Sequence, residues 1–345
     1  MKIITTTGFY GTGSSAITDL FSEMNNVCVK GDYEFRFVCD PDGISDLEYN
    51  LVENPNRHNT SNAIKRFKKQ VKFLNGGKII KRYNTFFGNS FIEMADNYID
   101  NICLFKYIGR WHFDLYERGV WFWIASRSYS KFRKLFDRIF KREKEREYTL
   151  LSDKELSYAG TFCESVFLQA TQQFIDGLFC KFNTQNKEYV MLDQLVPPTN
   201  LGRYIRYFSN IKIFVVDRDP RDIFLLEKLY WHGKVAPVYD VKIYCNWYQW
   251  TRQQFEIFPL PECVMKIQFE DIIYKYDETC ARILSFVGIK AENHIEKFSH
   301  LNPDVSKNNT KLWKKHPQFY EEIKYIEEKL KKYCYIYTDS SDTYN

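Results

Sequence analysis

A glycine-rich segment near the start of the chain is the first place where residue types and spacing could do chemistry. Residues 8–15 read GFYGTGSS, follow a short apolar run and precede a helical pattern of apolar residues over 17–24. A strand, a glycine-rich turn and a helix together bind phosphate, because successive N–H groups and the positive end of the helix dipole face the anion. The segment lacks the Gly-Lys-Ser/Thr ending of nucleoside triphosphatase loops. An ordinary glycine-rich turn is the alternative interpretation.

A second candidate lies where the predicted strand 211–216 ends, and there residues 217–222 read DRDPRD. In open α/β sheets, ligands bind beyond the carboxyl ends of the strands. Arg218 and Arg221 could present guanidinium groups to a phosphate at that place. The alternative is a surface turn whose aspartates and arginines pair with each other.

The elements around these segments alternate between strands and helices, which favours a parallel sheet with right-handed crossovers. Besides the first strand, the predicted strands are 27–29, 189–192 and 211–216, and residues 265–272 are interpreted as a strand that runs into an acidic turn. We predict an α/β fold, a P-loop-type parallel sheet flanked by helices, forming a single domain over 1–335.

The stretch of about 55–185 predicts a large, mostly helical insertion in this domain. Within it, residues 131–146 alternate basic and apolar side chains, which predicts an amphipathic basic helix. Such a helix could make peripheral contact with an anionic membrane or with an acidic glycan, and a merely solvated face is the alternative. The polar residues 336–345 predict a flexible tail.

Composition limits the classes of function. The chain has 345 residues, 18% of them aromatic, and a net charge of +5, which suits anionic ligands. The basic residues are dispersed among nearly as many acids, so we expect no nucleic-acid partner. Nine cysteines without Cys-x-x-Cys spacing predict reduced thiols and no metal site. With neither a signal peptide nor a long apolar run, we expect a cytoplasmic protein.

In this order, the segments resemble those of the sulfotransferase superfamily, which transfers a sulfuryl group from 3′-phosphoadenosine 5′-phosphosulfate (PAPS). Residues 8–15 resemble its 5′-phosphosulfate loop, and 215–222 its 3′-phosphate motif. Residues 268–289 are similar to its Tyr-Glu-Asp-Leu and Phe-Leu-Gly segment, and 306–313 to its C-terminal loop that covers the nucleotide. The resemblance covers about 1–30 and 187–335, and its style is that of bacterial glycan sulfotransferases.

The resemblance implies a set of PAPS-binding residues: Tyr10, Gly11, Thr12, Gly13, Ser14, Ser15, Arg218, Arg221, Lys307, Asn308 and Lys311. The product would be 3′-phosphoadenosine 5′-phosphate (PAP), and the resembled mechanism uses no metal. Two positions depart from the family's pattern. Gly11 stands where a Lys or Arg is usual, and Leu226 stands where a Ser is usual. Arg36, Lys81 and Arg221 are the candidate replacements for the missing cation.

The acceptor hydroxyl needs a general base. In the resembled glycan enzymes this base is a Glu or His at the end of a neighbouring strand, which points to Glu34, with Arg36 beside it. Asp32 is the competing carboxylate, and a solvated loop carboxylate is the alternative for Glu34. The candidate acceptor contacts are Asp193, Trp111 and His112. For the tryptophans of the insertion, packing within the insertion's own core is the alternative.

We therefore expect a sulfotransferase that moves a sulfuryl group from PAPS to a hydroxyl of a carbohydrate, such as a precursor of a surface polysaccharide or a glycolipid. A non-catalytic nucleotide- or glycan-binding protein of the same fold is one alternative. A P-loop nucleotide-dependent kinase, which would need magnesium, is the other.

Overall fold

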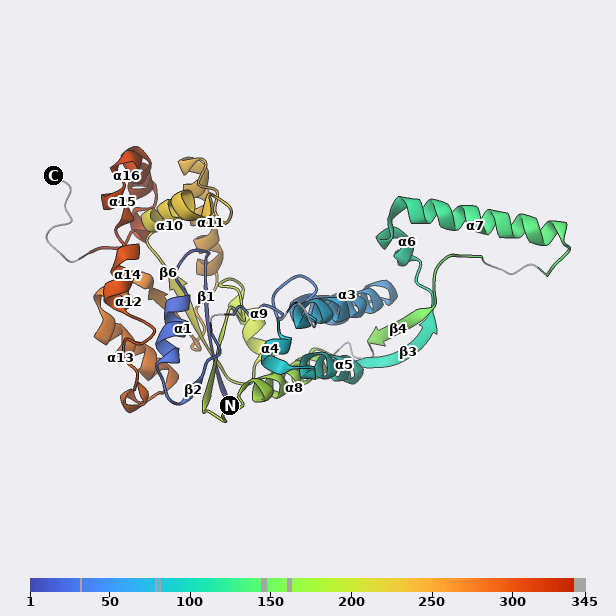
Figure 1. The fold of residues 1–345 in the computed structure, drawn as a ribbon, viewed down its shortest axis with the longest axis horizontal. Coiled ribbons are helices and arrows are strands. Elements are labelled where there is room, and N and C mark those ends of the chain that lie inside the picture. The colour runs from blue at the N-terminus through green and yellow to red at the C-terminus, as the bar shows by residue number, and fades with distance from the viewer. Residues whose placement is uncertain (32, 78–79, 81, 144–147, 160–162, 338–345) are drawn as a thin grey trace.

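Parallel strands form the centre of the computed structural model, which describes residues 1–31, 33–77, 80, 82–143, 148–159 and 163–337 (Figure 1). The strands are β1 Lys2–Gly8, β2 Val27–Cys28, β5 Tyr189–Asp193, β6 Ile211–Asp217 and β7 Val264–Gln268. They lie in the order β2-β5-β1-β6-β7, and every pairing is parallel. The predicted α/β fold with a parallel sheet is confirmed.

The carboxyl ends of the central strands lie at one edge of the sheet. Thr6 of β1 pairs with Asp193 of β5, and Gly8 pairs with Val216 of β6. The residues that follow β1, β5 and β6 therefore meet at this edge, where α/β proteins bind their ligands.

Helices cover both faces of the sheet because alternate strand residues point to opposite sides. Ile3, Val190 and Ile213 belong to one core, to which helices α3 Arg57–Asn75, α5 Ser90–Ile102 and α8 Glu164–Phe182 contribute. Ile4, Met191 and Phe214 belong to the other core, with helices α1 Ser15–Ser22, α12 Phe269–Tyr274 and α13 Tyr276–Val287. Strands buried on both faces are typical of parallel sheets.

A third cluster of apolar side chains joins the segment after β6 to the C-terminal part of the chain. Its helices are α10 Pro220–Leu226, α11 Val241–Glu256, α15 Leu312–Lys315 and α16 Tyr320–Lys329. The remaining short helices are α2 Ile44–Glu48, α4 Asn84–Phe87, α9 Leu201–Tyr204 and α14 Pro303–Ser306. Two π-helical turns, Tyr49–Glu53 and Glu227–Trp231, follow α2 and α10.

An arm projects from the body of the molecule between α5 and α8 (Figure 1). Its base is an antiparallel pair of strands, β3 Cys103–Gly109 and β4 Lys154–Ala159, and beyond them lie α6 Phe113–Glu117 and α7 Gly119–Ile139. This strand pair was not predicted in the mostly helical stretch 55–185. The assignment of 1–335 to one domain with an insertion stays a prediction.

The basic helix expected over 131–146 starts earlier and ends earlier than predicted, because α7 spans Gly119–Ile139. Lys141 has a positive φ of 51°, and the Arg142 N–H donates to the Asp137 carbonyl 3.0 Å away. A left-handed residue with this hydrogen bond ends a helix. Lys144 and Arg146, from the end of the predicted run, lie outside the described residues.

Three other expectations also fall on residues outside the described part: Asp32 as a competing base, Lys81 as a replacement cation, and the tail beyond Tyr337. Tyr337 itself packs against Trp313, with ring centres 5.8 Å apart. Among the described residues, no helix is both long and apolar enough to span a bilayer.

Candidate functional site

A cavity of about 560 Å³ lies at the edge of the sheet where β1, β5 and β6 end. Its lining brings together several residues singled out in the sequence: Tyr10, Gly11, Thr12, Gly13, Ser14, Ser15, Glu34, Arg36, Asp193 and Arg218. We call this cavity the sheet-edge pocket. Leu226, which stands at the usual serine position, also lines it.

The backbone of the glycine-rich loop has an unusual conformation. Tyr10, Gly11 and Gly13 have positive φ values of 69°, 63° and 78°. Within the described residues, the N–H groups of residues 10–15 make no hydrogen bond to the protein. Consecutive N–H groups of this kind at the start of a helix form an anion-binding concavity. The loop therefore has the donors that a phosphate or phosphosulfate requires.

Close packing fixes the position of this loop. A Cβ atom at Gly13 would lie 2.7 Å from the ring of Phe269, so only glycine fits there. Gln194 holds the far end of the loop, since its Nε2 donates to Ser14 Oγ at 3.2 Å and its Oε1 accepts from Thr7 Oγ1 at 3.3 Å. Gly11 differs from Gly13, because the nearest side-chain atom to a Cβ there, on Ile223, would be 3.9 Å away.

Arg218 joins the loop to the C-terminal segment 306–311. Its guanidinium donates to the carbonyl of Gly11 at 3.5 Å and to the carbonyl of Asn309, and it stacks over Phe269 at 4.5 Å. Its Nε is buried and has no hydrogen-bond partner among the described residues. A buried, partly satisfied guanidinium at the wall of a pocket is suited to binding an anion.

Arg221, predicted to bind the same nucleotide, has a different environment. It forms ion pairs with Asp219 at 2.5 Å and Glu327 at 2.7 Å, and stacks over Trp313 at 3.8 Å. It does not appear in the lining of the sheet-edge pocket. The two interpretations of the DRDPRD segment therefore apply to different arginines: Arg218 faces the pocket, and Arg221 pairs within the protein.

Asp222 of this segment and the nearby Glu270 accept hydrogen bonds from the backbone of other segments. Asp222 accepts hydrogen bonds from the N–H groups of Lys311 at 3.1 Å and Leu312 at 2.8 Å, and Glu270 accepts from the N–H of Asp219 at 3.0 Å. Burial, together with the nearby Asp219 carboxylate, raises the pKa of Asp222 to about 7 and raises the pKa of Glu270 well above its ordinary value.

A separate buried pair supports the loop from behind. Arg252 donates to Asp217 at 2.7 Å and lies over the rings of Tyr248 and Phe9. Burial alone would raise the pKa of Asp217, but the adjacent Arg252 and Lys266 outweigh that effect and hold the pKa below its ordinary value. Phe9 belongs to the loop, so this pair stabilises the loop's position.

The C-terminal segment meets the pocket through a different residue from those predicted. Asn309 lines the pocket, whereas Lys307, Asn308 and Lys311 do not. The Lys307 ammonium pairs with Asp304 at 2.9 Å, and the Lys311 ammonium lies 4.3 Å from the ring centre of Tyr337. The carbonyl of Asn308 accepts from Lys315 at 2.9 Å.

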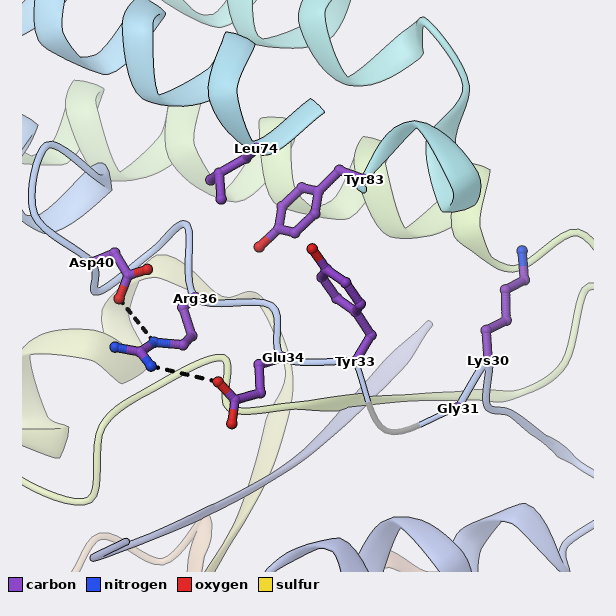
Figure 2. Close-up of a pocket in the computed structure, with 8 residues that line it drawn as sticks. All are labelled: Lys30, Gly31, Tyr33, Glu34, Arg36, Asp40, Leu74 and Tyr83. Carbon is purple, nitrogen blue, oxygen red and sulfur yellow. Dashed lines mark hydrogen bonds and ion pairs between the residues drawn. The ribbon is translucent and has the colours of Figure 1, made fainter. Parts of the chain in front are cut away.

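Glu34 and Arg36 line the sheet-edge pocket and also a second cavity of about 480 Å³, which we call the outer pocket. Figure 2 shows the residues that line the outer pocket. Arg36 reaches between two carboxylates, with Nε 2.9 Å from Asp40 and Nη1 3.5 Å from Glu34. Burial lowers the pKa of Arg36, but Asp40 and Glu34 more than compensate, so the pKa is raised. Of the three candidate replacement cations, Arg36 lines the sheet-edge pocket.

Backbone pairing places Glu34 at this boundary. Glu34 forms an isolated parallel bridge with Asp193, and the N–H of Phe35 donates to the Asp193 carbonyl at 2.9 Å. The aromatic rings of Tyr33 and Tyr83, 5.7 Å apart, line the outer pocket beside Leu74. One carboxylate thus faces both cavities.

The structure does not bring Trp111 and His112 to either pocket. Both precede α6 in the arm, where the Trp111 ring lies 5.2 Å from that of His58. Their position follows from the unpredicted strands β3 and β4, which carry this part of the chain away from the sheet (Figure 1).

Several lining residues were not found from the sequence, among them Gln194, Glu227, Trp231 and Asn309. Glu227 is buried, and burial raises the pKa of its carboxyl, which accepts from the N–H groups of Val235 and Ala236. A Gln directly after a strand-end Asp was an available signal for Gln194. Within the described residues, no cluster of His, Cys, Asp and Glu side chains could hold a metal ion.

Comparisons with known proteins gave structural matches only: no protein-family model matches the chain, and no curated protein does. A sulfotransferase domain from the curacin biosynthetic pathway is 13% identical, with a TM-score of 0.39, over 96% of this chain and 97% of that one. Retinol dehydratase in complex with androsterone and the inactive cofactor PAP is 13% identical, with a TM-score of 0.33, over 98% and 84%. Sulfotransferase STF9 from Mycobacterium avium is 11% identical, with a TM-score of 0.32, over 95% and 76%.

Proposed function

We propose that this protein is a sulfotransferase that moves a sulfuryl group from PAPS to a hydroxyl of a carbohydrate. The observation that carries the proposal is the meeting, in one pocket, of free loop N–H groups, the Arg218 guanidinium and the Glu34 carboxylate. The donors suit the two phosphate groups of the nucleotide, and the carboxylate suits the deprotonation of an acceptor.

Different residues would bind different groups of the nucleotide. The N–H groups of residues 10–15 would hold the 5′-phosphosulfate at the start of α1. Arg218, with its unpartnered Nε, would bind the 3′-phosphate beside Asn309. Arg36 would take the place of the usual loop cation, since it lines the same pocket and Gly11 offers no charge.

Transfer then requires an acceptor oxygen in line with the sulfur. The Glu34 carboxylate would accept the proton of the acceptor hydroxyl as the acceptor oxygen bonds to sulfur. The bond from sulfur to the 5′-phosphate oxygen breaks in the same step, and PAP leaves with that oxygen. The protein's contribution is positioning and charge stabilisation rather than covalent chemistry.

The outer pocket supports a carbohydrate acceptor. It opens on Glu34, and two tyrosine rings line it together with the charged side chains Lys30, Arg36 and Asp40. Aromatic rings with one polar end suit a ligand that is partly apolar and partly wet, as a sugar ring is, and charged groups can hydrogen-bond its hydroxyls.

A titration of thermal stability with PAP, ATP with magnesium, and GTP with magnesium tests the nucleotide site. A ligand that binds only the native protein raises the melting temperature as its concentration exceeds the dissociation constant. We expect a shift with PAP alone. A shift only with a triphosphate and magnesium would replace the proposal with a phosphotransferase.

A second candidate, a protein that binds the nucleotide without transferring sulfate, is favoured by Gly11 and by the pocket's carboxylates. Arg36 and Arg218 line the pocket together with Glu34, Asp193 and Glu227, so its carboxylates outnumber its guanidinium groups. The measurement that separates the candidates is PAP release from PAPS in the presence of neutral and acidic sugars. PAP binding without release on any acceptor would favour the second candidate.

A further inference from the structure

Helix α7 and the three residues after it carry an unusual share of the protein's positive charge. Residues 119–142 contain seven of the chain's 49 Lys and Arg residues but only one, Asp137, of its 44 acids. The rest of the chain therefore holds 42 basic against 43 acidic residues and is close to neutral. The net charge of +5 is in effect located on the arm.

The face that α7 buries is the opposite of the face that a helix of a globular core buries. Its buried residues are Ser126 and Asp137, which face the segment after the helix. The Ser126 hydroxyl accepts from the Leu150 N–H at 3.4 Å, and Asp137 accepts from the Tyr148 hydroxyl. A helix normally buries its apolar stripe and exposes its polar face. Here the polar stripe is the one that packs.

The apolar stripe of α7 faces outward instead. Trp121, Phe132, Leu135 and Ile139 recur at helical spacing, and they are 84%, 65%, 51% and 64% exposed. Arg127, Lys131, Lys134 and Arg138 have the spacing i, i+4, i+7 and i+11, so they form a second stripe beside the first. An exposed apolar patch of this kind marks an interaction surface.

We propose that the outward face of α7 docks on the surface of a membrane that contains anionic lipids. An apolar stripe flanked by a basic stripe is the arrangement of helices that lie in the headgroup region of a bilayer. Both properties of the face are used there: the apolar side chains enter the acyl boundary, and the basic side chains meet the lipid charge. This proposal is independent of the proposed transfer reaction.

Two other occupants fit the face less well. A second copy of residues 119–142 would bring seven further basic residues against the first seven, which opposes dimerisation. An acidic glycan would match the basic stripe but would leave Phe132, Leu135 and Ile139 in water. A bilayer surface is the partner whose chemistry matches both stripes.

Co-sedimentation with vesicles tests the proposal on the full chain. We expect binding to vesicles of phosphatidylcholine and phosphatidylglycerol in equal parts, weaker binding at high salt, and no binding to phosphatidylcholine alone. A variant with Lys131→Gln, Lys134→Gln and Arg138→Gln should lose about fivefold in affinity per charge, on the order of a hundredfold in all. A variant with Trp121→Ser, Phe132→Ser, Leu135→Ser and Ile139→Ser should lose at least about tenfold.

The matched control removes the same charge elsewhere. Lys290→Gln, Lys324→Gln and Lys331→Gln are exposed positions outside the arm, and vesicle binding should stay within about twofold of the parent. Because all the substituted side chains are exposed, the melting temperatures of the variants should equal that of the parent, and PAP-induced shifts should be unaffected.

Three results would overturn the proposal. Equal losses in the control and the charge variant would show attraction by net charge only. A concentration-dependent dimer that the apolar variant abolishes, without vesicle binding, would assign the face to a second copy. Binding to dextran sulfate but not to anionic vesicles would assign it to an acidic polymer.

Discussion

The sheet-edge pocket and the arm both contain arginines, but the environments of these arginines differ. In and behind the pocket, Arg218 and Arg252 are buried, and each contacts a backbone carbonyl, a carboxylate or an aromatic face. On the arm, Arg127, Lys131, Lys134 and Arg138 of α7 are exposed and lie beside exposed apolar side chains. A buried charge needs partners, and those partners fix its position. Exposed charges instead add up to an electrostatic potential over a wide surface. The first arrangement suits recognition of one small anion, and the second suits attraction to a broad anionic surface.

Removal of the proposed base should have the largest effect that is specific to the pocket and does not involve the arm. Glu34→Gln should lower turnover with PAPS by about 10² to 10⁴, the usual contribution of a general base, and leave PAP affinity nearly unchanged. The control is Asp40→Asn, the other carboxylate on Arg36, which should retain turnover. Equal loss in both variants would mean that the position of Arg36, and not the Glu34 carboxylate, carries the effect.

Buried and exposed charges should differ in their effect on stability. Arg252→Met removes the closer of the two cations that pair with the buried Asp217, the other being Lys266 at 3.3 Å, and should lower the free energy of unfolding by about 3–5 kcal/mol, measured in urea. Lys332→Met, which breaks an exposed pair with Glu256, should cost less than about 1 kcal/mol. If the two losses were similar, burial would not distinguish the pairs.

Arg218→Ala tests the pocket's contact with the nucleotide. Loss of a charge-assisted hydrogen bond should weaken PAP binding by about 2–3 kcal/mol, measured by calorimetry. Lys131→Ala on the arm removes the same charge and should leave PAP affinity as it was. Unchanged affinity in the Arg218 variant would exclude this residue from the site.

The buried acids behind the pocket should make stability depend on pH. The pKa of Asp222 is raised in the folded protein, so the folded state holds its proton more tightly than the unfolded state does. Its contribution is therefore complete below about pH 4 and is lost as the pH rises to about 7, at no more than about 1.4 kcal/mol per pH unit. Asp222→Asn should make this slope shallower, whereas Asn at the exposed Asp304 should not. An unchanged slope in the Asp222 variant would mean that this carboxyl is not protonated on folding.

The pocket was more predictable from sequence than the arm. The glycine-rich loop and Arg218 lie at strand ends, and the alternation of strands and helices places strand ends at one edge. Gln194 and Asn309 reach the pocket by local turns that no periodicity marks. Arg221 could not be told apart from Arg218, because the difference depends on Glu327 and Trp313, about a hundred residues further along the chain.

The arm illustrates the opposite case. The helical pattern of 131–146 was visible, but the stripe of α7 that would be buried was not. An amphipathic helix normally buries its apolar stripe, whereas α7 buries Ser126 and Asp137. Residue type alone was the basis for predicting Trp111 and His112 as acceptor contacts. Their location depends on β3 and β4, whose exposed Leu104, Phe105 and Ile108 give no clear signal of one buried face.

Strands β3 and β4 have a mechanical consequence. A strand of seven residues spans about 20 Å, and pairing with β4 makes it stiffer than a single chain. If α7 rests on a lipid surface, the strand pair would act as a spacer that holds the sheet-edge pocket away from that surface. An acceptor sugar attached directly to a lipid would then be too close to the bilayer to reach Glu34. Under the two proposals together, such a spacer would favour hydroxyls on sugars that lie several units along a glycan from its lipid anchor.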